Sequence, residues 1–320
     1  MRILALVPGG IGDQILFFPT LDDLKRSYPN AQIDVVVEPR SVSAYQVCRA
    51  FPQVIPFDFK DTNGPADWGN LLGIIRDREY DATLSLGRRL GVGFFLWLTG
   101  IPKRVGYKVG FGQNFLTDPV DFNPNQYAAH MYHDLVKGLE IDGTCPELSV
   151  NVPKADIEWA ERELTRLGVA ASGYILIHGG ASSLSRKLGI DKTYPIEQWQ
   201  QVIKSLQERQ DKPVVFIEGP DDQDVVAGLV QACPTVKIIR PTDIGKLTAV
   251  IAAASLMLCT NSAPMHLAIA TGTYTFALFG PTDPAKLIPA SSKAVAIKSP
   301  TGKMADIPPA DILAKVWGNG

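Results

Sequence analysis

A glycine-rich loop near the start of the chain ends in a carboxylate. It reads PGGIGD at residues 8–13, between a short apolar run at 3–7 and an amphipathic stretch at 14–27. We expect the run to form a strand and the stretch to form a helix, because these patterns are typical of those elements. From the carboxyl end of such a strand, Asp13 could take a proton from an attacking hydroxyl. It could instead cap the helix, and the sequence leaves both roles open.

The glycines of this loop match a dinucleotide-binding fingerprint only in part. Gly10 and Gly12 occupy two of its glycine positions, but Ile15 stands at the third. Glu38 follows a second apolar run at 33–37, where dehydrogenases carry the acid that binds a ribose. A dehydrogenase is the weaker interpretation, and Gly10 and Gly12 are candidates for an acceptor-side loop.

A second candidate loop, TNSAPMH at residues 260–266, precedes a predicted helix. Asn261 or Ser262 could cap that helix, and Pro264 is favourable in its first turn. The free N–H groups and the positive dipole end of a helix N-terminus can bind a pyrophosphate. His266 lies one turn into the helix, where a structural histidine is the simpler alternative to a ligand.

Two more loops of the second half carry charged residues. Lys192 begins the segment KTYPIEQW at 192–199, just before a predicted helix, and a lysine there can reach a phosphate or simply remain solvated. Asp222 ends the segment EGPDD at 218–222, where it could bind ribose hydroxyls or cap the following helix. A turn-rich segment, FGPTDP, follows at 279–284.

The elements that position these loops follow an alternating order. In the second half we predict strands at 174–177, 214–217, 236–239, 256–259 and 275–278, and helices at 196–210, 222–232, 244–253 and 264–271. Strands of this length that alternate with longer helices indicate parallel sheets. A chain of 320 residues is long enough for two domains. We therefore predict an α/β protein with two Rossmann-like domains, 1–155 and 156–320, that face each other across a cleft.

The composition excludes several classes of protein. A net charge of −2 argues against a nucleic acid partner, which requires a basic face. The cysteines (Cys48, Cys145, Cys233 and Cys259) show neither CxxC nor histidine at ligand spacing, which indicates reduced thiols and no zinc site. The start of the chain is interpreted as a first strand rather than a signal peptide. No window reaches the roughly 18 apolar residues that a membrane span needs.

The order of these loops is more specific than any one of them. The distinctive stretches are the opening at 9–37, RVGY at 104–107, KTYPIEQW at 192–199 and TNSAPMHLAIATGTYTFALFGPTDP at 260–284. In these residues the sequence resembles glycosyltransferase family 9, the lipopolysaccharide heptosyltransferases. The resemblance extends over nearly the whole chain.

This resemblance implies a GT-B fold and an inverting, metal-independent transfer of heptose from ADP-heptose to a lipid-linked or oligosaccharide acceptor. The first domain would bind the acceptor, with Asp13 as the catalytic base. The second would bind the donor, with Lys192 in contact with it and Asp222 on its ribose. Its diphosphate and sugar would lie on Asn261, Ser262, Ala263, Met265 and His266. No cofactor beyond the nucleotide sugar is expected. The enzyme would be cytoplasmic, with a peripheral contact at the inner face of the cytoplasmic membrane.

The chain departs from the family pattern at four positions. Asn261 and Ala263 stand where the family usually has Asp and Gly, Asp222 replaces Glu, and Tyr194 replaces Trp. Asparagine keeps hydrogen-bonding capacity but loses the carboxylate. Two alternatives therefore stay open: a catalytically degraded relative that binds sugar nucleotides, and a GT-B-type epimerase or hydrolase that needs no acceptor.

One basic segment lies outside these motifs. Residues 76–108 hold seven basic and three acidic residues, around the apolar run VGFFLWL at 92–98. The run could be a buried helix with solvated flanks. It could instead expose aromatic side chains beside a basic rim that faces an anionic lipid or a phosphorylated acceptor.

Overall fold

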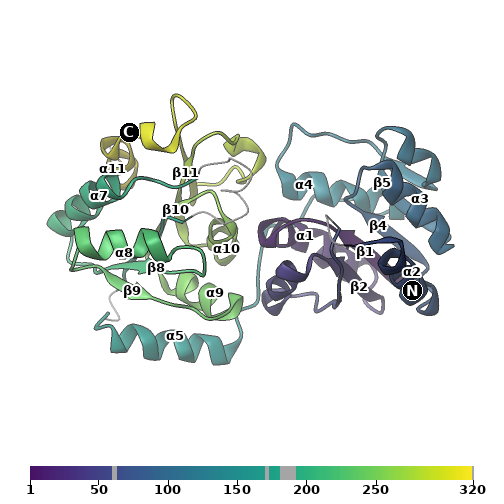
Figure 1. Cartoon of the computed structure of the whole chain (residues 1–320), viewed down its shortest axis with the longest axis horizontal. Coiled ribbons are helices and arrows are strands. Elements are labelled where there is room, and N and C mark those ends of the chain that lie inside the picture. Colours follow the sequence, from purple (N-terminus) through teal and green to yellow (C-terminus); the bar gives the residue numbers. More distant parts are fainter. Residues whose placement is uncertain (60–62, 170–172, 181–191, 319–320) are drawn as a thin grey trace. The chain divides into compact units, whose positions relative to one another are not determined.

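The computed structural model describes residues 1–59, 63–169, 173–180 and 192–318. The chain forms two compact units, Met1–Asn151 and Val152–Gly320 (Figure 1). The predicted boundary after residue 155 would cut the helix α5 (Lys154–Arg166), whereas the observed division precedes that helix. None of the helices among the described residues combines the length and the apolarity that a membrane crossing requires.

Unit 1 contains a six-stranded parallel sheet in the order β3-β2-β1-β4-β5-β6. Its strands are β1 (Arg2–Val7), β2 (Gln32–Val37), β3 (Gln53–Pro56), β4 (Ala82–Ser85), β5 (Lys103–Tyr107) and β6 (Asp118–Val120), and its helices are α1 (Ile11–Ser27), α2 (Pro65–Asp77), α3 (Leu90–Thr99), α4 (Ala128–His133), η1 (Pro39–Val47), η2 (Phe111–Phe115) and η3 (Asp134–Leu139). The strand order reverses between β1 and β4. Ligands of such sheets bind outside the carboxyl ends of the strands at this reversal.

Unit 2 repeats the plan with a parallel sheet in the order β12-β11-β10-β7-β8-β9. Its strands are β7 (Ile175–His178), β8 (Val214–Ile217), β9 (Lys237–Ile239), β10 (Leu256–Thr260), β11 (Tyr274–Phe279) and β12 (Ala294–Lys298), and its helices beside α5 are α7 (Ile196–Arg209), α8 (Gln223–Ala232), α9 (Ile244–Ala253), α10 (Ala263–Thr271), α11 (Pro309–Trp317), η4 (Pro284–Lys286) and η5 (Met304–Asp306). The strand order reverses between β7 and β10, where the predicted donor loops begin.

The central strands are buried along nearly their whole length. The burial of β1 and of β7 is continuous rather than alternating, as expected for parallel strands covered by helices on both faces. In unit 2, α7 contacts both α8 and α11, while α9 contacts both α5 and α10 (Figure 1). Two parallel sheets with helices confirm the α/β prediction. The predicted strands correspond to β1, β2, β7, β8, β9, β10 and β11, whereas β3, β4, β5, β6 and β12 were not predicted.

One predicted helix boundary is wrong. The helix expected from residue 14 begins at Ile11, so Asp13 lies inside its first turn rather than before it. The reason is the backbone of Gly10, which serves as the N-cap residue and whose N–H donates to Asp13 Oδ2 at 2.8 Å. A glycine offers no side-chain signal for a helix start, so the apolar periodicity placed the start three residues too late.

Candidate active site

Asp13 accepts hydrogen bonds on both of its carboxylate oxygens. Oδ2 accepts from the Gly10 N–H, and Oδ1 accepts from the Tyr132 hydroxyl at 3.0 Å. The carboxylate packs against Gly9, where an added Cβ would lie 2.4 Å from Oδ2 and where φ is +135°. Asp13 therefore caps the N-terminus of α1. This capping does not exclude proton transfer, because an ionised carboxylate has about four acceptor sites and two are used here.

The two glycines of the predicted acceptor-side loop have different positions. Gly10 precedes α1 and holds Asp13, whereas Gly12 lies within the first turn of the helix. The loop is further fixed by Gln14, whose Nε2 donates to Val7 O at 2.9 Å and whose Oε1 accepts from the Tyr45 hydroxyl. A buried amide thus fastens the end of β1 to the start of α1.

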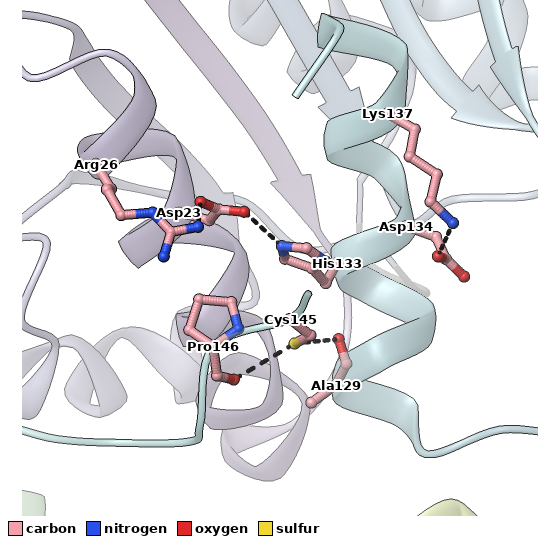
Figure 2. A network of polar contacts seen from close by, with 8 residues as sticks. All are labelled: Asp23, Arg26, Ala129, His133, Asp134, Lys137, Cys145 and Pro146. Carbon is pink, nitrogen blue, oxygen red and sulfur yellow. Dashed lines mark hydrogen bonds and ion pairs between the residues drawn. The ribbon is translucent and has the colours of Figure 1, made fainter. Parts of the chain in front are cut away.

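A buried polar contact between His133 and Asp23 joins α4, which carries Tyr132, to α1, which carries Asp13 (Figure 2). His133 Nε2 lies 2.7 Å from Asp23 Oδ2, and both side chains are buried. The second oxygen of Asp23 lies 2.5 Å from Arg26. Cys145 Sγ lies near the carbonyl oxygen of Ala129 on the same helix. Asp23 and His133 are 110 positions apart, and Asp13 and Tyr132 are 119 positions apart. No local sequence pattern could therefore have shown that Tyr132 contacts Asp13.

A cavity of about 1150 Å³ adjoins the site within unit 1. Its wall includes Pro8 at the end of β1, Glu38 at the end of β2, Arg88 after β4 and Tyr132 itself. Arg88 lies over the ring of Phe122, with the guanidinium carbon 4.6 Å from the ring centre. A cavity of this size at the carboxyl ends of parallel strands is the usual place for a small-molecule ligand.

The second candidate loop, in unit 2, is held by polar contacts of its side chains. Asn261 is buried and its Nδ2 donates to Thr282 Oγ1 at 2.7 Å. Ser262 is the N-cap residue of α10, but its hydroxyl lies 3.3 Å from His178 Nδ1 and makes no bond to the helix. The loop at 279–284, which contains Thr282, therefore lies directly beside the loop at 260–266, as the order of strands predicts.

Few backbone N–H groups remain at this helix N-terminus for a phosphate. Pro264 has no N–H, and the N–H of Met265 already donates to Ser262 O at 3.1 Å. The side chain of Met265 is fully buried in the core, so it can offer a donor no direct contact. The amides of Ser262 and Ala263 are the ones that an anion could still use in this loop.

The charge of Lys192 acts on His266. Burial, and then this nearby charge, lower the pKa of His266 from 6.5 to about 4. His266 is buried, and its Nδ1 has no hydrogen-bond partner among the described residues. The charge of one predicted donor-binding residue therefore acts on another from a distant part of the sequence, and the lowered pKa leaves the histidine neutral at pH 7.

Asp222 is held by a backbone N–H of its own loop and lies beside a buried histidine. Its Oδ2 accepts from the Gly219 N–H at 3.0 Å and lies 3.3 Å from His178 Nε2. Its side chain is buried and packs so closely on Gly180 that a Cβ there would lie 1.6 Å from Oδ1. His178, which the sequence analysis did not single out, thus links Asp222 to Ser262. Ribose binding by Asp222 stays a prediction.

The Tyr194 substitution has a structural explanation. Tyr194 is fully buried, donates to Ile307 O at 2.8 Å and packs edge-on against Trp199, so the replacement of Trp at this position concerns the core.

Asp222 and Asp224 form an Asp-x-Asp sequence, a pattern that can bind a metal ion in other transferases. Among the described residues, no group of three or more His, Cys, Asp or Glu side chains could hold a metal ion.

The geometry defines a class of protein: two Rossmann-like units with parallel sheets, as in GT-B transferases, and polar loops at the strand ends of both. The sequence model of glycosyltransferase family 9 (heptosyltransferase) matches residues 69–316. The chain belongs to this family and is a glycosyltransferase.

Two relatives illustrate how widely this sequence type is used. The chain is 27% identical to the photosynthetic NDH subunit of subcomplex B 1 from Arabidopsis thaliana, over 96% of this chain and 71% of that protein. It is 25% identical to lipopolysaccharide heptosyltransferase 3 from Escherichia coli, over 85% of this chain and 81% of that protein. The first of these relatives is a subunit of a protein complex, and the second is a transferase.

Two solved structures show the same fold. A family 9 glycosyltransferase from Veillonella parvula superposes with a TM-score of 0.87 at 19% identity and covers 99% of this chain and 96% of its own. The E. coli heptosyltransferase WaaC with ADP-2-deoxy-2-fluoro heptose superposes with a TM-score of 0.77 at 17% identity and covers both chains fully. The predicted fold class is thereby confirmed.

Proposed function

We propose that this glycosyltransferase moves heptose from ADP-heptose, with inversion and without a metal ion, to a hydroxyl of a lipid-linked or oligosaccharide acceptor. The observation that carries the proposal is the position of Asp13, which is held by Tyr132 beside a ligand-sized cavity at the strand ends of unit 1. The WaaC structure, which holds an ADP-heptose analogue, supports the choice of donor. We place the enzyme in the cytoplasm.

In this mechanism unit 1 serves the acceptor. The acceptor hydroxyl donates its hydrogen bond to Asp13 and attacks the anomeric carbon from the face opposite the leaving ADP. As the new carbon–oxygen bond forms, the proton passes to the Asp13 carboxylate and the bond to ADP breaks. A single displacement of this kind inverts the configuration at that carbon.

Unit 2 serves the donor. Negative charge develops on the diphosphate as it leaves, and Lys192 with the Ser262 and Ala263 amides meets that charge. His266 contributes as a neutral side chain, because its lowered pKa keeps it uncharged at pH 7. A lysine and fixed dipoles thus perform the task that Mg²⁺ performs in other transferases.

ADP release from ADP-heptose, with and without acceptor, tests the proposal. Wild-type enzyme should release ADP in an acceptor-dependent manner and retain activity in EDTA, and the product should have the inverted anomeric configuration by NMR. Asp13→Asn should keep ADP affinity but lower kcat by roughly 10²–10⁴-fold, the scale of general-base loss. Near-normal kcat in this variant would reduce Asp13 to a helix cap. Strict metal dependence would contradict the lysine-and-dipole mechanism.

A catalytically silent member is the second candidate function. Asn261 and Ala263, together with the similarity to a chloroplast NDH subunit, favour it. The double variant Asn261→Asp/Ala263→Gly separates the two cases. In a working enzyme it should change the relative turnover of different nucleotide sugars, whereas in a silent relative it should create turnover where none existed. Acceptor-independent turnover by the wild type would instead indicate an epimerase or hydrolase.

A further inference from the structure

The wall of the unit 1 cavity has an apolar side and a polar side. Helices α2 and α3 supply Trp68, Leu72, Phe94, Phe95 and Leu98 to the apolar side. Trp68 and Phe95 meet edge to face with ring centres 4.9 Å apart. The ends of the strands supply the polar residues Glu38 and Arg88. One side of the cavity therefore offers large apolar surfaces with few hydrogen-bonding groups.

One wall residue of the cavity, Tyr132, contacts the Asp13 carboxylate. The Tyr132 hydroxyl donates to Asp13 Oδ1 at 3.0 Å. A molecule seated in the cavity therefore has part of its surface beside Tyr132 and hence near Asp13. A sugar placed against the α2–α3 wall would lose hydration of its hydroxyls without compensation, which is costly. An apolar group there would gain the free energy of burial.

We propose that the acceptor is an amphiphilic alcohol whose hydroxyl lies beside Tyr132 and Asp13 and whose apolar portion fills the cavity between α2 and α3. The assignment of the hydroxyl rests on the proposed function. The cavity, at about 1150 Å³, reaches the upper end of the range for whole small-molecule ligands, so it can hold an alkyl, prenyl or aryl group of substantial size. The apolar group of the acceptor therefore contributes to its recognition together with the hydroxyl group.

Binding of two simple glycosides to the purified protein tests this assignment. Octyl β-D-glucoside and methyl β-D-glucoside share a head group and differ in the length of the alkyl chain. Each buried methylene should tighten binding about fourfold. Calorimetry below the micellar concentration should therefore give a Kd for the octyl glycoside at least about 100-fold lower than that for the methyl glycoside.

Two glycines of α2 provide a matched pair of variants. Gly69 lines the cavity and Gly73, one turn later, does not. A Cβ at either position would meet no atom within 4 Å, so both accept a larger side chain. Gly69→Leu should fill part of the cavity and weaken octyl glucoside binding by about 10-fold or more, whereas Gly73→Leu should leave binding unchanged. Both variants should fold, since leucine favours a helix more than glycine does.

A surface variant controls for adsorption of the alkyl chain outside the cavity. Phe111 is 82% exposed and is not part of the cavity wall. Phe111→Ser should leave octyl glucoside binding unchanged. Loss of binding in this variant, equal affinity for the two glycosides, or full affinity in Gly69→Leu would each overturn the assignment.

These measurements use neither donor nor turnover, so the two proposals can fail separately. If octyl glucoside binds as expected but no sugar is transferred, the proposed reaction is wrong and the apolar site remains. If transfer occurs and alkyl chains improve neither Kd nor KM, the reaction stands and the amphiphilic acceptor is wrong.

Discussion

The orientation of the Asp13 carboxylate depends on two hydrogen-bond donors. The Gly10 N–H fixes one oxygen and the Tyr132 hydroxyl fixes the other, so the carboxylate has little rotational freedom. The pKa of Tyr132 lies well above its ordinary value because the hydroxyl is buried and faces the charge of Asp13. The tyrosine therefore remains a donor throughout the physiological range.

Removal of this donor should affect turnover. Tyr132→Phe keeps the ring that lines the cavity but frees Oδ1 of Asp13, and we expect kcat to fall about tenfold because the base is less well oriented. Tyr127→Phe is the matched control, since the Tyr127 hydroxyl is buried on the neighbouring turn and has no hydrogen-bond partner among the described residues. Steady-state kinetics of both variants decide the point. Equal loss in both would indicate a packing effect rather than orientation.

His266 should make the stability of the protein depend on pH. Its pKa is about 4 in the folded state and 6.5 as an ordinary histidine. Between these values the unfolded chain binds a proton that the folded chain does not, so stability falls as pH decreases from about 6.5 to 4. The loss is on the order of 3 kcal/mol at about 1.4 kcal/mol per pKa unit.

Urea unfolding of wild type and His266→Gln at pH 7 and at pH 4.5 measures this contribution. Groups other than His266 titrate equally in both proteins and cancel in the comparison. The free energy of unfolding should fall more steeply with decreasing pH in the wild type than in the variant. Parallel pH dependences would show that the folded protein protonates His266 normally.

At the scale of elements, the start of α10 offers less to a diphosphate than its sequence indicates. Proline removes one N–H and an internal bond occupies that of Met265. The proposed mechanism then assigns a larger share of the anion's stabilisation to Lys192, which precedes α7. The strands β7 and β10, after which the two segments follow, are neighbours in the sheet.

A lysine variant tests the contribution of Lys192 to diphosphate binding. Lys192→Ala should weaken ADP binding by about 1.5–3 kcal/mol, the usual value of a charge-assisted hydrogen bond. Lys204→Ala, an exposed lysine on α7, should leave the affinity unchanged. Calorimetry with ADP gives both values. Unchanged affinity in Lys192→Ala would place the donor elsewhere.

At the scale of the whole molecule, α3 is neither the fully buried helix nor the fully exposed face that the sequence left open. Phe95 and Leu96 are buried, while Leu90, Phe94 and Trp97 are exposed. Phe94 and Trp97 stack with ring centres 5.8 Å apart, and the 3-10 helix η2 adds the exposed Phe111. Arg88 and Arg89 flank this aromatic surface in the sequence. Exposed aromatics beside arginines are typical of surfaces that contact anionic membranes.

Sedimentation with anionic vesicles tests a peripheral membrane contact. We expect binding at low salt that weakens at high salt, because screening reduces the contribution of each arginine, about 1 kcal/mol. Arg88→Glu/Arg89→Glu and Trp97→Ser should both reduce binding. Val230→Ser, at an exposed apolar residue of unit 2, should not. Absence of binding at low salt, or binding that is indifferent to salt and to these variants, would contradict a membrane contact through α3.

The fold class and the strand ends that carry the candidate site were predictable from the amino-acid sequence alone. Continuous apolar runs alternating with amphipathic stretches specify parallel strands and helices locally, so β1, β7 and β10 lie where the runs placed them. The loops after those strands, with Asp13, Lys192 and Asn261, followed from the same reasoning, because the position of a loop depends on the elements next to it.

The residues that surround those loops could not be predicted, because they come from distant parts of the chain. Tyr132 meets Asp13, His178 joins Asp222 to Ser262, and Lys192 acts on His266, each across many positions of sequence. The cavity between α2 and α3 likewise has no sequence signature, because its aromatic side chains are indistinguishable from core residues in their spacing. Local periodicity reports which face of an element is apolar. What that face meets depends on contacts between distant segments, and these form only when the whole domain packs.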